Sequence, residues 1–134
     1  MKILKLTTVI LLIVTAVGCE TKQEAARTNL AITWKIDQVI RAGVDDTQNY
    51  TESRSSYRIS YTKEGTFQER YTSFGSSTVT EINGSWTINS NVTTLNLETD
   101  FSSRAFSIDL LESTNLNVTD QGEPDDLKIF FVPA

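Results

Sequence analysis

The sequence predicts an all-β domain of about eight antiparallel strands that follow one another as an up-and-down meander and close into a barrel. Three observations lead to this prediction: apolar and polar residues alternate with period two, turn-forming segments separate the alternating runs, and no convincing amphipathic helix interrupts them. Both prolines, Pro124 and Pro133, come late in the chain, so no proline disturbs the earlier strands. Eight strands can close on themselves and thereby remove exposed sheet edges.

The first half of the chain contains three predicted strands. The apolar face of the first strand holds Ile32, Trp34, Ile36 and Ile40. Glycine, aspartate and asparagine over residues 42–49 then supply turn chemistry. The tight turn "KEG" at 63–65 joins the next two strands, whose alternating aromatic and apolar residues are Tyr57, Ile59, Tyr61, Phe67 and Tyr71.

The second half repeats the pattern with shorter strands. Each run carries two or three large apolar residues at alternate positions, and polar turns separate the runs. These residues are Ile82, Trp86 and Ile88; Leu95 and Leu97; Phe106, Ile108 and Leu110; Leu116 and Val118; and Leu127, Ile129 and Phe131.

Residues 1–18 have the pattern of a secretory signal peptide. Lys2 and Lys5 precede an apolar run that includes residues 10–14, and small residues follow just before Cys19. The apolar run is too short and ends too abruptly for a membrane-spanning helix. We therefore expect this segment to be removed.

Cys19 is the only cysteine in the chain, and "TAVGC" at 15–19 resembles the lipobox of bacterial lipoproteins. The resemblance implies that the signal is cut before Cys19 and that its thiol is acylated, which gives stable anchoring through several lipid chains. Glu20 after the cysteine favours the outer membrane of the cell envelope. We expect a lipidated cysteine and polar tether over 19–29, followed by the barrel domain over 30–134.

Without the signal peptide the chain holds ten basic and seventeen acidic residues, a net charge of −7. Such a chain is repelled by phosphate backbones, so nucleic acid is not expected as a partner.

No catalytic, metal or cofactor site is predicted. The chain lacks histidine, acylation would leave no free thiol, and no phosphate loop, nucleophile elbow or zinc spacing occurs. The acidic residues at 45–46 and over 120–126 lack the spacing of a calcium loop and are interpreted as turn formers. Glu69 and Glu81 fall within strands. Glu69 is either a buried, cavity-facing acid or, if the register changes, a residue of the rim.

Three short motifs resemble the small lipocalin-like lipoproteins of Bacteroidetes. They are "TWKI" at 33–36, "TKEGTF" at 62–67 and "GSWTI" at 84–88, downstream of the lipobox. In that family the first strand usually carries a glycine where Ile32 stands here. The resemblance implies a lipocalin-like barrel that binds a small apolar or amphipathic ligand.

Seven aromatic residues fall on strand positions predicted to face inward: Trp34, Tyr57, Tyr61, Phe67, Tyr71, Trp86 and Phe106. They are the candidate ligand-binding residues. Two hypotheses remain open, because an eight-stranded barrel is either filled by its side chains or holds one small ligand. A filled barrel would be a structural or interaction module that docks an envelope protein. The motif of Trp86 keeps a glycine, Gly84, that lets backbone pack closely beside a ring, whereas the motif of Trp34 has Ile32 at that position, so Trp86 is a better candidate for ligand contact than Trp34.

Overall fold

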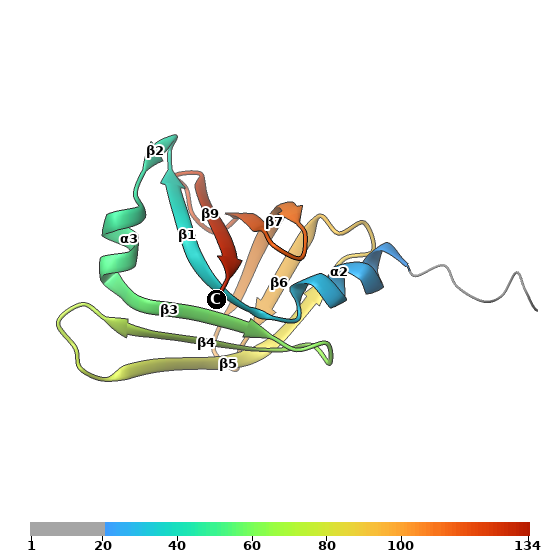
Figure 1. Cartoon of the computed structure of the whole chain (residues 1–134), viewed down its shortest axis with the longest axis horizontal. Helices are drawn as coiled ribbons and strands as arrows, with labels where there is room; N and C mark the ends of the chain where they lie inside the picture. The colour runs from blue at the N-terminus through green and yellow to red at the C-terminus, as the bar shows by residue number, and fades with distance from the viewer. Residues whose placement is uncertain (1–20) are drawn as a thin grey trace, which may run out of the picture.

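The computed structural model describes residues 21–134, so the predicted signal peptide and Cys19 lie outside the described residues. Nine antiparallel strands form one sheet in the order β2-β1-β3-β4-β5-β6-β7-β8-β9 (Figure 1). Pairing between β1 and β9 closes eight of them into a barrel, and β2 is an extra strand beside β1. This confirms the predicted fold class. The strands are β1 (Thr33–Arg41), β2 (Val44–Asp45), β3 (Arg54–Tyr61), β4 (Thr66–Ser73), β5 (Val79–Ile88), β6 (Thr94–Glu98), β7 (Ser103–Leu111), β8 (Leu116–Asp120) and β9 (Leu127–Pro133).

The barrel has two ends that differ in their covering helix. Helix α2 (Lys22–Leu30) precedes β1 at one end, together with the turns at 62–65, 89–93 and 112–115. Helix α3 (Thr47–Ser53) lies at the other end, with the loops at 74–78, 99–102 and 121–126. Figure 1 shows α2 on the right and α3 on the left. We call these the α2 end and the α3 end.

Helix α2 replaces most of the polar tether predicted over 19–29. Thr21 caps its first turn in a capping box with Glu24. Ala26 and Leu30 are buried against the barrel, at 5% and 0% exposure. Only these two apolar side chains of the helix face the core, which is too few to give the sequence the pattern of an amphipathic helix. The polar segment is therefore packed on the domain. Neither helix within residues 21–134 is long and apolar enough to cross a membrane.

A β-bulge reverses the predicted facing of the end of β1. Ile36 and Gln38 pair with consecutive residues of β9, which leaves Asp37 as an extra residue. A shift of one residue turns every later side chain to the opposite face. Val39 is consequently fully buried, and Ile40, expected on the inner face, points outward and is only half-buried.

A second bulge has the same effect in β7. Ile108 and Leu110 pair with consecutive residues of β8, and Asp109 is the extra residue. Leu110, expected to face inward, is consequently 37% exposed.

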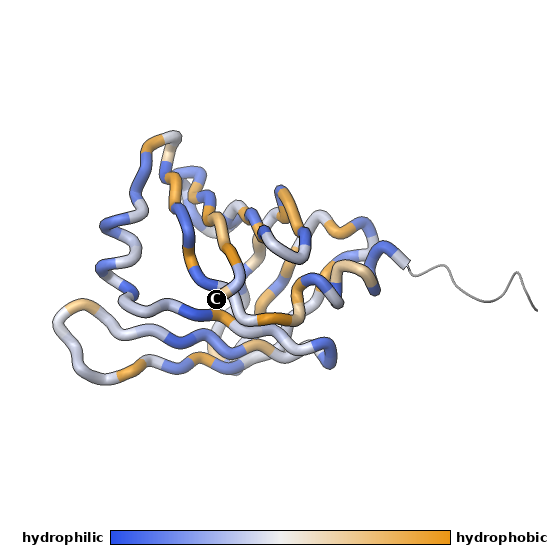
Figure 2. Tube along the Cα trace, viewed as in Figure 1, coloured by the Kyte–Doolittle hydropathy of each residue, from blue (hydrophilic) through white to orange (hydrophobic). Residues whose placement is uncertain are grey.

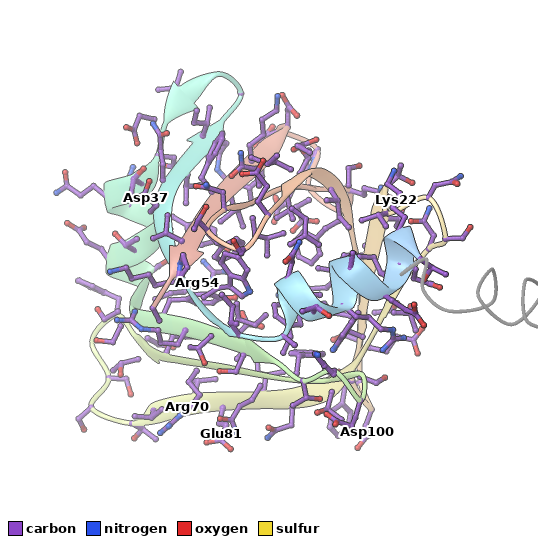
Figure 3. All side chains as sticks on the ribbon, turned by 45° about the vertical axis from the view of Figure 1, so that its right-hand side comes forward. Lys22, Asp37, Arg54, Arg70, Glu81 and Asp100 are labelled. Carbon is purple, nitrogen blue, oxygen red and sulfur yellow. The ribbon has the colours of Figure 1, made fainter. Side chains whose placement is uncertain are left out.

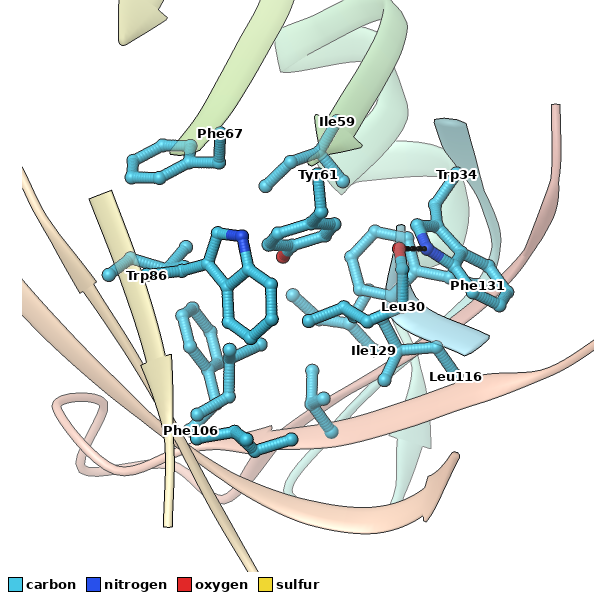
Figure 4. Packing of buried hydrophobic residues seen from close by; sticks show 14 of the residues in the cluster. Leu30, Trp34, Ile59, Tyr61, Phe67, Trp86, Phe106, Leu116, Ile129 and Phe131 are labelled. Carbon is cyan, nitrogen blue, oxygen red and sulfur yellow. Dashed lines mark hydrogen bonds between the residues drawn. The ribbon is translucent and has the colours of Figure 1, made fainter. Parts of the chain in front are cut away.

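The core consists of large side chains from α2 and from every strand except β2 (Figure 4). Figure 2 shows apolar and polar residues interleaved along the sheet, as expected for strands with one buried face. Leu30 of α2, Trp34 of β1 and Leu116 of β8 are all fully buried, so the helix closes the α2 end of the barrel. The interior that is left lies between this plug and α3.

Candidate functional site

Both tryptophans belong to the closed α2 end. Trp34 is fully buried, and its indole N–H donates to the carbonyl of Leu30 at 3.0 Å (Figure 4). Trp86 is 2% exposed, and its indole N–H donates to the carbonyl of Thr62 at 3.0 Å. The guanidinium of Arg27 lies 4.8 Å from the centre of the Trp86 ring. The hydrogen bond of Trp34 therefore holds the end of α2 against the barrel wall, and that of Trp86 holds the turn at 62–65 against it.

Gly84 allows a close contact beside Trp86. A Cβ at this position would lie 2.1 Å from the carbonyl oxygen of Glu98 and 2.7 Å from Cε1 of Phe67. The glycine thus gives space to both the Phe67 ring and the backbone at the end of β6. Ile32, just before β1, packs partly buried against the core.

A small cavity remains inside the barrel. Its volume, counted as the space open to the centres of water molecules, is about 30 Å³, enough for a few waters. Its apolar wall consists of Ile59, Leu95, Leu97, Phe106, Leu116, Val118, Ile129 and Phe131. Its polar lining consists of Tyr50, Tyr57, Tyr61, Arg104 and Asp120. Tyr50, Arg104 and Asp120 border the cavity toward the α3 end.

The seven predicted interior aromatics divide into two groups. Those that line the cavity are Tyr57, Tyr61 and Phe106. Those that do not are Trp34, Phe67, Tyr71 and Trp86. Tyr71 stacks on Tyr57 with ring centres 6.2 Å apart, and the other three are buried in the core. The structure therefore offers Trp86, the better candidate of the two tryptophans, no place in the cavity wall.

An ion pair crosses the interior near the α3 end. Glu69 on β4 is 3% exposed and accepts a hydrogen bond from Nη2 of Arg104 on β7 at 2.5 Å. Glu69 therefore faces inward. The Arg104 side chain is 36% exposed. Burial opposes its charge, but the attraction and hydrogen bond of Glu69 outweigh this effect and raise the pKa of Arg104. The pair as a whole is neutral, and it fixes the Arg104 guanidinium beside the cavity.

Helix α3 covers the cavity at this end. Its Tyr50 lines the cavity, and the guanidinium of Arg54 lies 4.3 Å from the Tyr50 ring and 6.0 Å from the Tyr71 ring. The Thr47 hydroxyl accepts a hydrogen bond from the Val39 N–H at 2.9 Å. No residue of α3 is fully buried, and the side chain of its N-cap residue, Asp46, does not cap a backbone N–H of the helix. A few polar and cation–π contacts thus hold this helix over the opening.

The cavity tyrosines remain neutral hydrogen-bonding groups. Burial raises the pKa of Tyr57 well above its ordinary value of 10.0, and it also raises the pKa of Tyr61 and Tyr50. Their hydroxyls can therefore donate to a ligand over the whole neutral range.

Three cavity residues were outside the sequence prediction. Arg104 lies two residues before Phe106 in β7, and Asp120 lies two residues after Val118 in β8, so each shares the inward face of its neighbour. The alternation could therefore have indicated both. Tyr50 belongs to α3, which begins within the turn predicted over 42–49 and extends beyond it, in a segment without a strand signal.

The acidic turns near α3 are engaged in local structure. Asp45 accepts from the Thr47 backbone at 2.9 Å, and Asp46 pairs with Arg41 at 3.1 Å. Within residues 21–134, no group of three or more acidic, histidine or cysteine side chains is placed to hold a metal ion.

Comparison with known proteins agrees with this architecture. No match to the chain was found among the curated proteins. A lipocalin-like protein from Bacteroides uniformis, solved by crystallography, superimposes with a TM-score of 0.59 at 14% identity, over 79% of this chain and 99% of that one. At that identity the likeness concerns the fold alone. The family model of the lipocalin-like domain matches residues 30–129. The chain belongs to the lipocalin-like domain family.

Proposed function

We propose that the chain is a lipid-anchored protein of the cell envelope whose barrel binds a small amphipathic ligand. The observation that carries the binding proposal is the asymmetry of the cavity. Its wall is largely apolar, and its two charged residues, Arg104 and Asp120, lie toward the α3 end together with Tyr50. Such a pocket suits a ligand with one apolar and one polar part.

The polar part would lie against Arg104. Among the described residues, Glu69 is the one acceptor bonded to this guanidinium, so most of its donors face the cavity or solvent. A carboxylate or another oxygen-rich head group would complete its bonding. The apolar part would lie against Leu95, Val118 and Ile129.

The ligand must be small or must displace side chains. A cavity of about 30 Å³ is well below the several hundred cubic ångströms of an ordinary ligand pocket. Tyr50 and α3 are the groups to move, because α3 is held by few contacts and Tyr50 is only half-buried.

The anchoring proposal rests on the sequence alone. "TAVGC" at 15–19 resembles a lipobox, and Glu20 favours the outer membrane. Acylation at Cys19 would leave the barrel outside the bilayer on the periplasmic or surface face.

A filled barrel that docks another envelope protein is the second candidate. The small cavity favours it, as does the hydrogen bonding of the interior: among the described residues, every fully buried side-chain nitrogen or oxygen has a partner. A filled barrel of this kind would be stable without a ligand.

Calorimetric titration of residues 20–134 with decanoate and with decanol separates the two candidates. Binding requires the interior, so Val118→Phe should abolish it while Asn117→Phe, on the outer face of the same strand, should not. Loss of one charge-assisted hydrogen bond costs about 1.5–3 kcal/mol, so Arg104→Met should weaken decanoate roughly 10- to 100-fold. Arg70→Met, which removes an exposed arginine on β4, is its control.

The outcomes are distinct. Decanol should bind equally well to wild type and to the Arg104 variant. No heat with either amphiphile, together with no co-purified small molecule in native mass spectra, would reject ligand binding and leave the filled barrel.

A further inference from the structure

We propose that the barrel stands on the bilayer with its α2 end toward the lipid and its cavity opening, at the α3 end, away from it. This inference rests on the proposed acylation of Cys19. It implies that ligand enters the cavity from the aqueous side. A hydrophobic ligand that diffuses within the membrane would not reach the opening directly.

The first argument is the shortness of the link. Only Glu20 separates Cys19 from Thr21, which the capping box fixes at the start of α2. Two residue steps span at most about 7 Å. An anchored barrel therefore has almost no tether.

The second argument is that α2 is fixed to the barrel. Leu30 is fully buried, and the Gln23 side-chain amide donates to the carbonyl of Ile88 at 2.7 Å. Nη1 of Arg27 donates to the carbonyl of Lys63 at 2.9 Å. The helix and the α2 end thus form one body, and the anchor holds that end nearest the lipid. The α3 end lies about 30 Å away along a nine-residue strand such as β1.

The third argument is the distribution of charge. The α2-end segments are balanced, with three basic residues (Lys22, Arg27, Lys63) and three acidic ones (Glu24, Glu64, Glu112). The α3-end segments, counted with β2 and Asp46, carry seven acidic residues: Asp45, Asp46, Glu52, Asp100, Glu123, Asp125 and Asp126. Two basic residues adjoin them, Arg41 at the end of β1 and Arg54 at the C-cap of α3. In Figure 3 Lys22, at the start of α2, lies across the view from Arg54, which follows α3. An anionic lipid surface repels the α3 end even though Arg41, at the end of β1, pairs with three of its acids.

Two exposed aromatic residues define the competing arrangement. Phe74 and Phe101, at 82% and 98% exposure, lie in α3-end loops and could enter a bilayer if the barrel lay on its side. Asp100 adjoins Phe101, and inserting it beside lipid would be costly. The experiment therefore compares the two ends directly.

The single cysteine of the chain makes site-specific labelling straightforward. Once Cys19 is acylated, Lys63→Cys and Phe74→Cys each present one free thiol, at the exposed α2-end turn and the exposed α3-end loop. The full-length variants are purified from the membrane fraction, and the mass of the N-terminal peptide shows whether Cys19 carries lipid. Each is then labelled with a fluorophore and placed in phosphatidylethanolamine–phosphatidylglycerol vesicles with a spin-labelled head group as a short-range quencher.

The proposal predicts a several-fold steeper quenching slope at position 63 than at position 74. Equal slopes, or a steeper slope at position 74, in acylated protein would overturn the orientation and leave the anchoring intact. An unmodified Cys19 would overturn the anchoring and the orientation together, and it would leave the ligand proposal untouched.

Discussion

Removal of Arg104 should destabilise the barrel because it leaves the buried Glu69 carboxylate without its charged partner. The Glu69 side chain is 4% exposed and the Arg104 side chain 36% exposed. Breaking a fully buried pair costs about 3–5 kcal/mol, and partial hydration of Arg104 lowers the expected loss to about 2–3 kcal/mol for Arg104→Met. Arg70→Met breaks a 3.6 Å pair with Glu81 between exposed side chains, so its cost should stay below about 0.5 kcal/mol.

Urea unfolding of residues 20–134, followed by tryptophan fluorescence, measures this difference. With a slope of about 1–3 kcal/mol per molar urea, the midpoint of Arg104→Met should fall by roughly 1–2 M. Adding Glu69→Gln should recover most of the loss, since the neutral amide no longer needs a cation. If Arg104→Met and Arg70→Met have the same midpoint, or if the double variant is as unstable as Arg104→Met, the pair is not the buried charge contact described above.

Three further predictions concern packing and titration. Gly84→Ala should lower the free energy of unfolding in urea by about 3 kcal/mol or more, since the new Cβ would lie 2.1 Å from a backbone oxygen. Ser85→Ala, on the exposed face, is the control and should change the free energy of unfolding by less than about 0.5 kcal/mol. Equal effects of the two substitutions would contradict the close packing at Gly84. Leu30→Ala should lower the free energy of unfolding by about 2–5 kcal/mol because the Leu30 side chain is fully buried. An unchanged urea midpoint would mean that α2 is not part of the folded unit. Burial raises the pKa of Tyr57 and Tyr61, so the stability they contribute should be complete below pH 10.0 and fall as pH rises from there through their folded-state pKa values; native phenolate absorbance that develops at the ordinary pKa would refute this.

The sequence predicted the barrel because period-two alternation and turn chemistry are local signals. They failed at two places for one physical reason. An extra residue in a bulge, Asp37 in β1 and Asp109 in β7, reverses the faces of the residues after it, so Ile40 and Leu110 were placed on the wrong side. Bulges depend on the pairing of distant strands, which alternation within one strand does not report.

The cavity was only partly predictable. Alternation placed Tyr57, Tyr61 and Phe106 in its wall, but it could not separate the wall from the packed aromatics of the closed end. That division depends on how α2 fills one end, and α2 itself has too few apolar residues to be recognised. Tyr50 reaches the cavity from a helix that only begins within a predicted turn, so its place follows from tertiary packing alone.

The central claim, that the barrel interior takes a ligand from the α3 end, is tested most directly by NMR titration of residues 20–134 with decanoate. The account predicts saturating shifts of the Leu95, Val118 and Ile129 methyl groups, which line the cavity. The indole N–H signals of Trp34 and Trp86, bonded at the closed α2 end, should stay unshifted as internal controls. Shifts confined to the indoles or to outer-face residues, with unchanged cavity methyls, would contradict it.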